Sequence, residues 1–451
     1  MFDILKRNFK GGVHPKENKK YTESKPIEEI PLPEEVIIPL QQHIGKPSKI
    51  IVNKGDKVNA GDPVSEAGGF VSVPCHASIS GTVKAIQPHI HPLGGEVTSV
   101  IIESDGEDKY SEKIEFNPDY MNLSPEEMKN MIYEAGIAGM GGATFPTHVK
   151  LSPPPEKKID TAILNGSECE PYLTSDHRLM LEKTEEIIEG FRIIMKILGV
   201  NRGIVGIENN KPDAIKKTEE VSSKFPEIGV VSLDVKYPQG AEKQLIYALT
   251  RRKVPPGKLP MEVGCLVQNV GTAKAVYDAV AYKRPLIDRI VTVAGDITYQ
   301  KNLKVRIGTP MKNLTDYCGG FVNSPKKIII GGPMMGIAQH SLNAPVIKGT
   351  SGIIILRSEQ IGFGKTTPCL NCGKCVEICP MNLTPNIIAS LVENGRIEDA
   401  GEYNALDCIE CGCCSYICPA KINLVQNIKF AKFKIMQEAK KLLTFFSKES
   451  K

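Results

Sequence analysis

Two cysteine runs near the C-terminus have the spacing of iron–sulfur ligands. Both read C-x2-C-x2-C-x3-C-P, the pattern in which three cysteines ligate one [4Fe-4S] cluster and the fourth ligates the other. Thiolates are soft ligands that suit such clusters. The spacing therefore predicts two clusters that exchange their last ligand between the runs. The predicted ligand sets are Cys369, Cys372, Cys375 and Cys418 for the first cluster, and Cys408, Cys411, Cys414 and Cys379 for the second.

Other kinds of cysteine chemistry fit this pattern less well. A single C-x2-C pair could belong to a zinc knuckle or a redox dithiol, but two complete runs, each closed by a proline, favour clusters. Cys413 lies outside the spacing and is expected not to be a ligand, with local reactivity as the alternative. The remaining cysteines are scattered and suggest no disulfide framework, which fits a reducing cytosol. They are Cys75, Cys169, Cys265 and Cys318.

Two further stretches have residue types that could hold a ligand. The first, GMGGATFP at 139–146, follows an expected helix, whereas a dinucleotide fingerprint needs a strand before its glycine turn. Its glycines still let the backbone approach a phosphate or a flat ring closely. The second, NGSECEP at 165–171, follows a buried-strand candidate, at the end of the strand where open α/β sheets bind ligands. A structural turn is the alternative for either stretch.

The overall composition excludes some classes of protein. The 451-residue chain has a formal net charge of +4, which argues against the concentrated basic surface of a nucleic-acid-binding protein. Its N-terminus lacks the apolar core of a signal peptide, and no apolar run reaches the roughly 18 to 20 residues that span a bilayer. We therefore expect a soluble or peripheral protein, attached to any membrane through a partner or a surface helix.

The elements that must position these residues suggest a multidomain chain of mixed α/β and α+β class. Short β-prone pieces separated by turns give way to alternating strands and helices, which favour a mainly parallel sheet. Ser124, Pro125 and Glu127 form a capping box at the first helix of this part. The predicted order is an extended arm (1–35), a barrel-sandwich hybrid (36–105), an α/β domain (120–285), a β-grasp domain of the soluble-ligand-binding (SLBB) type (286–345), a connector (346–364), a two-cluster ferredoxin domain (365–424) and a basic amphipathic helix (425–451).

The hybrid domain resembles biotinyl and lipoyl carrier domains. The resemblance rests on GDKV at 55–58, GDPV at 61–64 and GTV at 81–83. Carrier domains have their modified lysine six residues before a proline, here Pro74, and this chain has Gly68 at that position. The resemblance therefore implies the fold without the swinging arm, and a structural role.

The C-terminal tail combines lysines with apolar residues at helical spacing. A helix would align Leu424, Ile428, Ala431 and Ile435 on one face and continue the stripe toward Phe446. Such a helix can lie on an anionic membrane or pack on a partner. The alternative is an ordinary surface helix packed on the ferredoxin domain.

The central stretches resemble the flavin-bearing subunit of respiratory complex I. The resemblance covers the glycine loop, the second loop, GAEK at 240–243 and NVGT at 269–272. It implies FMN, bound non-covalently, and NAD(H) as substrate. Met140, Thr144 and Ser167 depart from the arginine, glycine and aspartate of that family. The implied FMN and NADH contacts are Gly139, Gly141, Gly142, Thr144, Phe145, Lys150, Asn165, Glu168, Glu170, Glu242, Asn269 and Thr272.

Nearly the whole chain resembles the C subunit of the Rnf (Rsx) ion-translocating electron-transport complex. The motifs are FKGGVHP, PLQQHIGKP, GMGGATFPTHVKL, NGSECEPYLTSDHR, YPQGAEKQLI and GGPMMG, followed by the two cysteine runs. The resemblance implies a peripheral oxidoreductase subunit on the cytoplasmic face of the membrane. It would exchange electrons between NAD(H) and ferredoxin. Its implied partners are integral membrane and flavoprotein subunits of the complex, with ferredoxin or a cluster-bearing subunit.

The chemistry of these cofactors agrees with that function. A hydride carries two electrons, clusters accept one at a time, and a flavin does both, so no side chain need act as a catalytic acid or base. One alternative is a cobalamin-reductase-like flavoprotein with a corrinoid acceptor. The other is a flavin-free iron–sulfur adaptor subunit.

Overall fold

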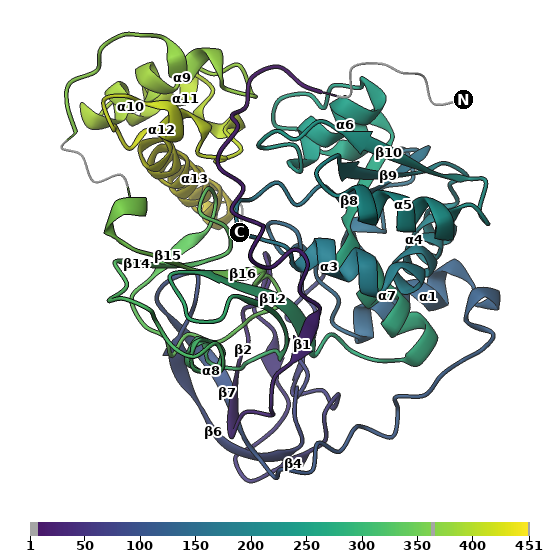
Figure 1. The fold of residues 1–451 in the computed structure, drawn as a ribbon. Coiled ribbons are helices and arrows are strands. Elements are labelled where there is room, and N and C mark those ends of the chain that lie inside the picture. The colour runs from purple at the N-terminus through teal and green to yellow at the C-terminus, as the bar shows by residue number, and fades with distance from the viewer. Residues whose placement is uncertain (1–7, 362–365, 450–451) are drawn as a thin grey trace.

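The computed structural model describes residues 8–361 and 366–449, with side chains as far as residue 441. Figure 1 shows three parts arranged around a long N-terminal segment: a cluster domain, a central α/β domain and a β-rich part. No helix within the described ranges is both long enough and apolar enough to cross a membrane.

The hybrid domain consists of two small antiparallel sheets. The larger has the strand order β2-β7-β6-β4 and the smaller pairs β3 with β5. In β2, Val36, Ile37 and Ile38 are all buried, so this strand is covered on both faces, with Val36 paired to Ile102 of β7. The bounds are β2 (Glu35–Pro39), β3 (Lys49–Ile50), β4 (Lys57–Val58), β5 (Ser65–Glu66), β6 (Gly81–Ile90) and β7 (Glu96–Ser104).

The central domain has a four-stranded, wholly parallel sheet of order β10-β9-β8-β11, which confirms the predicted α/β class. The predicted capping box is present, since Ser124 Oγ accepts from the Glu127 N–H and the Glu127 carboxylate accepts from the Ser124 N–H. The strands are β8 (Thr161–Gly166), β9 (Gly203–Glu208), β10 (Ile228–Leu233) and β11 (Cys265–Asn269). The helices are α1 (Pro125–Glu134), α2 (Thr147–Lys150), α3 (Ser175–Glu182), α4 (Thr184–Leu198), α5 (Pro212–Ser222), α6 (Glu242–Thr250) and α7 (Val270–Tyr282), with 3-10 turns at Tyr120–Asn122 and Pro260–Val263.

The β-grasp domain is larger than the sequence predicts. Its six-stranded sheet has the order β1-β13-β12-β16-β14-β15, and it includes β16 from the expected connector and β1 from the N-terminal arm. The stretch 346–364, predicted to be a β-rich connector, contains β16, a fully buried apolar strand that lies between β12 and β14 and pairs with both. The bounds are β1 (Ile27–Glu29), β12 (Asp288–Gly295), β13 (Lys301–Arg306), α8 (Met311–Tyr317), β14 (Lys327–Ile330), β15 (Ile337–Gln339) and β16 (Gly352–Leu356), with a 3-10 turn at Ser358–Gln360.

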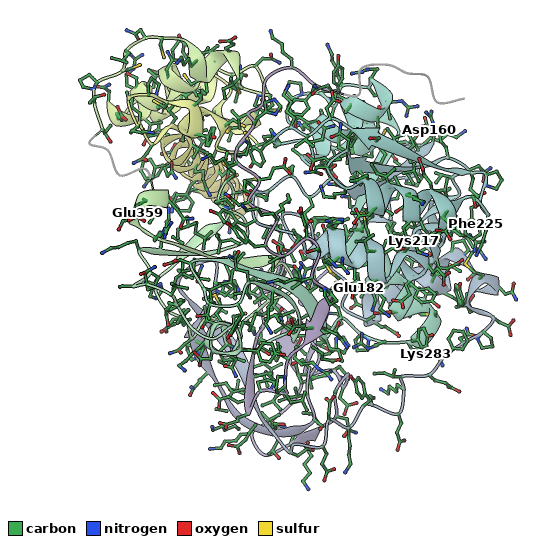
Figure 2. All side chains as sticks on the ribbon, viewed as in Figure 1. Asp160, Glu182, Lys217, Phe225, Lys283 and Glu359 are labelled. Carbon is green, nitrogen blue, oxygen red and sulfur yellow. The ribbon has the colours of Figure 1, made fainter. Side chains whose placement is uncertain are left out.

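The arm also contacts the central domain beside β1. The Ile27 N–H donates to the Glu182 carboxylate over 3.0 Å, and Figure 2 shows Glu182 at the border between α3 and β1. Arg178 holds the same carboxylate in place through a contact of 2.7 Å.

The cluster domain contains short helices and one long one. α13 packs on α10 and α11 through buried Leu424, Ile428 and Ala431, so this part of the apolar stripe packs on the ferredoxin domain, which is the alternative to a membrane or partner contact. The opposite face leaves Phe430 and Phe433 exposed. The bounds are α9 (Lys374–Glu377), α10 (Pro385–Glu393), α11 (Ile397–Glu402), α12 (Cys413–Ile417) and α13 (Leu424–Glu449), with a 3-10 turn at Ala405–Asp407.

Candidate redox site

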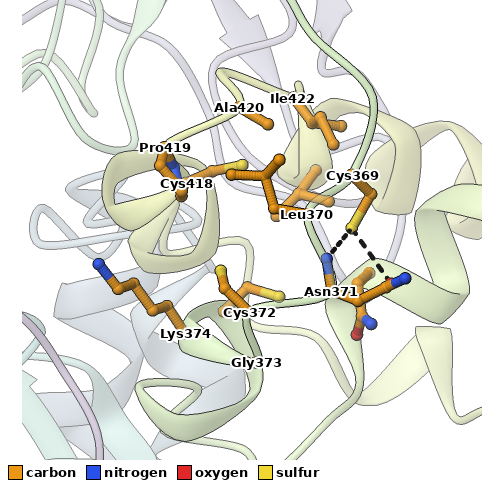
Figure 3. Close-up of a pocket in the computed structure, with 13 residues that line it drawn as sticks. Cys369, Leu370, Asn371, Cys372, Gly373, Lys374, Cys418, Pro419, Ala420 and Ile422 are labelled. Atoms are coloured by element: carbon orange, nitrogen blue, oxygen red, sulfur yellow. Dashed lines mark hydrogen bonds between the residues drawn. The ribbon is translucent and has the colours of Figure 1, made fainter.

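The first cysteine pocket lies in the cluster domain. Figure 3 shows Cys369, Cys372 and Cys418 around it, with Leu370 among them, and Cys375 completes the lining. The Asn371 N–H lies 3.5 Å from the Cys369 sulfur. Cys369 and Cys372 are exposed, whereas Cys375 and Cys418 are buried. The four residues of the first predicted ligand set thus line a single pocket.

The second pocket gathers the other four predicted ligands. Cys379, Cys408, Cys411 and Cys414 line it together with apolar side chains of α13. Backbone N–H groups point at two of the sulfurs, from Leu383 to Cys379 at 3.4 Å and from Glu410 to Cys408 at 3.3 Å. N–H donors near cluster sulfurs are a means by which proteins tune reduction potential.

The separation of the two pockets agrees with the exchange of Cys379 and Cys418 between the runs. Within the described ranges, no three His, Cys, Asp or Glu side chains are grouped closely enough for a single metal ion. Cys413 also lines the second pocket, but its sulfur lies 3.9 Å from the Tyr237 carbonyl oxygen.

The glycine loop is held against the start of α7. The Gly139 N–H donates to the Phe145 carbonyl over 2.9 Å, which closes the loop on itself. The Met140 N–H donates to Thr272 Oγ1 over 3.0 Å. A side chain at Gly141 would stand 2.9 Å from Asn269, while Gly142 faces open space. The absence of side chains at these two positions therefore keeps this stretch of backbone accessible.

Polar residues from three further elements contact one another near the edge of the sheet. Lys150 of α2 and Glu242 of α6 form an ion pair at 2.8 Å, and both are partly exposed. The Asn165 side chain, at the end of β8, donates to the Gly240 carbonyl over 2.8 Å. Ser167 Oγ is buried without a hydrogen-bond partner among the described residues. Five predicted contacts from separate parts of the chain thus lie around the carboxyl edge of the parallel sheet, namely Gly141, Lys150, Asn165, Glu242 and Asn269.

Other predicted contacts already have partners within the protein. The Glu168 carboxylate accepts from the Asp176 and His177 N–H groups at the start of α3, at 2.7 and 3.1 Å. The Glu170 carboxylate accepts from the Met334 and Met335 N–H groups at 3.0 and 2.9 Å. Burial raises the pKa of Glu170 to about 7. These two glutamates therefore shape the second loop, and their carboxylates are engaged by protein N–H groups.

Glu170 belongs to a junction that the sequence did not reveal. Tyr237 points its hydroxyl toward Glu170, at 3.4 Å, and donates to the Cys411 carbonyl over 2.8 Å. The N-terminal arm fills the space beside it, because Gly12 N–H donates to the Ile378 carbonyl over 2.7 Å and Val13 N–H to the Tyr237 carbonyl over 2.8 Å. The purple arm runs between the central and cluster domains in Figure 1. Gly12 and Val13 lie in FKGGVHP and Tyr237 in YPQGAEK, motifs to which the sequence alone assigns no such contact.

Comparison with protein families identifies four parts of the chain. Family models match residues 7–107 (RnfC barrel sandwich hybrid domain), 132–278 (Nuo51 FMN-binding domain), 290–338 (SLBB domain) and 368–422 (4Fe-4S dicluster domain). A relative from Clostridium ljungdahlii, the C subunit of a proton-translocating ferredoxin:NAD(+) oxidoreductase complex, is 51% identical, with 94% of this chain and 93% of the relative covered. The chain belongs to the RnfC family.

Further relatives support the same assignment. The C subunit of the Na(+)-translocating ferredoxin:NAD(+) oxidoreductase complex of Acetobacterium woodii is 47% identical, over 96% of this chain and 98% of its own. The C subunit of an ion-translocating oxidoreductase complex of Rhodobacter capsulatus is 42% identical, over 95% and 83%. An NAD+-reducing [NiFe]-hydrogenase crystal structure matches with a TM-score of 0.50 at 17% identity, over 72% of this chain and 63% of that chain, a likeness of fold alone.

These comparisons confirm several sequence predictions. The family, the fold class and the cofactor types, FMN and [4Fe-4S] clusters, are as predicted. The chain is a subunit of an electron-transferring oxidoreductase complex, which favours this function over the cobalamin-reductase alternative.

Proposed function

We propose that this chain exchanges electrons between NAD(H) and ferredoxin, using FMN at the edge of the central sheet and two clusters in the cysteine pockets. The observation that carries the proposal is the direct hydrogen bond between the two regions, from Tyr237 of the central domain to the Cys411 carbonyl of the cluster domain. When bound, FMN supplies the conversion between a two-electron hydride and single electrons.

The residues at the sheet edge fit a flavin phosphate and ring. The open backbone at Gly142 gives a flat or anionic group close access. Lys150 brings a positive charge whose protein partner, Glu242, leaves it partly exposed, so a phosphate can share it. The unpartnered Ser167 hydroxyl adds a polar group nearby. Phe145, half-buried at the end of the loop, is proposed to border the nicotinamide.

The remaining predicted contacts hold this edge in shape. Thr272 fixes the loop through Met140. Asn269 caps α7 through the Gly271 N–H at 2.8 Å and donates to Asp176 over 2.7 Å. Burial and the nearby Glu168 raise the pKa of Asp176 to about 6. Loss of these contacts would loosen the loop and weaken flavin binding indirectly.

We place the protein at the cytoplasmic face of the membrane, bound to integral membrane and flavoprotein subunits. The names of its relatives, which are parts of ion-translocating complexes, support an assembly with other chains. The exposed aromatic face of α13, with Phe430 and Phe433, is a candidate for contact with the complex or the lipid surface.

The flavin assignment can be tested by anaerobic reconstitution of the full chain with FMN, iron and sulfide. NADH should bleach the flavin absorbance and then the cluster absorbance. Lys150→Ala should weaken FMN binding by about tenfold, since a charge-assisted contact is lost, whereas Lys216→Ala on α5 should not. A chain that assembles both clusters yet binds no FMN and oxidises no NADH would support the flavin-free adaptor instead.

The ligand exchange can be tested separately by electron paramagnetic resonance of the reconstituted clusters. Cys418→Ser should remove the signal of the first cluster and Cys379→Ser that of the second. Cys413→Ser, outside the ligand spacing, should leave both signals in place. The opposite result, in which Cys418→Ser removes the signal of the second cluster and Cys379→Ser that of the first, would refute the exchange.

A further inference from the structure

A cleft of about 600 Å³ lies where the central domain meets the β-grasp domain. Its lining comes from α3 and α7 on the central side and from β1, β12 and β13 on the other. Figure 2 labels one of the lining residues, Glu182, at this border. None of the proposed FMN and NADH contacts belongs to the lining, as far as the structure describes the chain. Clefts of this size between domains are common sites for small molecules, so the protein has room for a further ligand.

Part of the cleft wall is apolar and aromatic. Leu179 and Ala275 are buried there, and the rings of Tyr277 and Tyr282 stand edge to face with their centroids 5.8 Å apart. Leu286 adds a further buried side chain from the segment that leads into β12. Such a wall gives the apolar or aromatic body of a ligand a surface to pack on, and burying that body is favourable by roughly 25 cal/mol per Å².

The basic side chains of the cleft lining are paired, with one exception. Lys183, Lys274, Arg284 and Lys304 each form an ion pair with a carboxylate of the same lining. Their charges are therefore balanced within the protein and attract a ligand only weakly. The exception is Arg289 of β12, which lines the cleft and takes part in no ion pair between described residues.

The Arg289 side chain is more than nine-tenths buried and only partly satisfied. It is 6% exposed, and its Nε donates to the Thr350 carbonyl over 3.1 Å, which fixes the guanidinium in the cleft lining. Its two terminal nitrogens have no hydrogen-bond partner in the described part of the chain, and burial lowers the pKa of Arg289 to about 10. A buried cation without a partner costs free energy, which an anion bound in the cleft would recover.

We infer that Arg289 binds the carboxylate of a small organic acid whose apolar or aromatic body packs against Leu179 and Tyr277. The planar fork of an arginine matches the two oxygens of a carboxylate. Asp176 lines the same cleft, and its charge acts on Arg289, so a second negative charge on the ligand would be repelled. The site therefore favours a single carboxylate over a phosphate. Because this site needs neither the flavin nor the clusters, the inference does not rest on the proposed function.

The test uses the full chain with FMN and both clusters, and benzoate as the probe. Binding is measured by isothermal titration calorimetry, with benzamide as the uncharged analogue of the same shape and inorganic phosphate as the more highly charged anion. Benzoate should bind saturably and raise the melting temperature, whereas benzamide and phosphate should bind about tenfold more weakly or not at all. Arg289→Gln should weaken benzoate binding about tenfold or more, because the neutral side chain cannot form the charge-assisted pair of hydrogen bonds.

Two further variants separate binding from folding. Ala275→Phe leaves Arg289 in place but fills the cleft from α7, so it should also abolish benzoate binding. Arg192→Gln on α4 removes an arginine that lies outside the lining and pairs with Glu189, and it should change the affinity for benzoate by less than about twofold. The melting temperature of each variant without benzoate reports whether the variant folds.

Several outcomes would overturn the carboxylate site. Equal binding of benzoate and benzamide by the unaltered protein would do so, and this comparison needs no variant. Unchanged benzoate affinity in a folded Arg289→Gln or Ala275→Phe variant, or phosphate binding as tight as that of benzoate, would have the same meaning. So would the absence of detectable binding of both benzoate and hexanoate, an aliphatic acid of similar size. NADH oxidation by the same preparation tests the proposed function separately, since a chain that binds benzoate but oxidises no NADH would contradict that function alone.

Discussion

The two cysteine pockets come from the same ligand pattern but have opposite surroundings. The first is lined by exposed Cys369 and Cys372, while the second places Cys411 and Cys414 in buried positions. The difference comes from segments far away in sequence, since the arm at Gly12 and the loop at Tyr237 both bind the backbone of the second pocket. The ligand pattern is therefore the same in both runs, whereas the packing of neighbouring segments decides which of the two pockets is bound by other parts of the chain.

The largest expected effect comes from a substitution at Gly12, where the N-terminal arm binds the backbone beside the second cysteine pocket. Its φ is +83°, and an added Cβ would stand 2.6 Å from the Tyr237 carbonyl oxygen. We expect Gly12→Ala to lower the free energy of unfolding by about 3 kcal/mol, because the alanine adds both left-handed backbone strain and a clash with a carbonyl oxygen. Thermal unfolding and limited proteolysis between the central and cluster domains would measure it.

The matched control for this substitution is Gly199→Ala. Gly199 also has a positive φ, +64°, but no atom lies within 4 Å of an added Cβ. Gly199→Ala should therefore lower the free energy of unfolding by about 1 kcal/mol, the cost of the left-handed strain alone. Equal losses in the two variants would mean that the arm does not fasten the domains together.

The pH dependence of stability tests the same junction through Glu170, which lies beside Tyr237. Burial raises the pKa of Glu170 from 4.5 to about 7, so the folded protein holds a proton that the unfolded chain releases. The stability due to this proton is complete below about pH 4.5 and is lost as the pH rises toward 7, by about 3 kcal/mol from the size of the shift. Glu170→Gln cannot ionise and should flatten this part of the curve of melting temperature against pH. An unchanged slope would show that Glu170 does not titrate with folding.

A milder change at the junction is Tyr237→Phe. It removes one donor to the Cys411 carbonyl, at 2.8 Å, and should cost about 1 kcal/mol. Hydrogen bonds and solvent access around a cluster set its reduction potential. In a redox titration, the midpoint reduction potential of the second cluster should therefore shift, while that of the first cluster should stay the same. Tyr416→Phe, an exposed tyrosine of α12, is the control. A shift of both midpoints, or of the first alone, would contradict the assignment of the junction to the second pocket.

The sequence predicts the parts of this molecule that depend on local pattern. Cysteine spacing leads to the two ligand sets, and the capping box at Ser124 leads to the start of α1, because each depends on residues a few positions apart. The junction escapes such reasoning, since Gly12, Glu170, Tyr237 and Cys411 come together only through domain packing. The place of β16 in the sheet could not be predicted for a similar reason, because a short apolar run has the same sequence pattern in a connector and in the middle of a sheet. Its neighbours, β12 and β14, decide its place.

The smallest expected effect concerns the outer face of α13. Phe433 is 57% exposed, whereas Ile428, on the inner face beside the second pocket, is buried. Phe433→Ala should therefore change the stability of the isolated protein by less than about 0.5 kcal/mol, while Ile428→Ala should cost about 2 to 4 kcal/mol through the cavity it leaves. Thermal unfolding of the two variants measures the contrast. If Phe433→Ala leaves the isolated protein intact but releases it from membranes of cells that contain the complex, the outer face serves assembly. Destabilisation equal to that of Ile428→Ala would instead mean that both faces of the helix are packed within the chain.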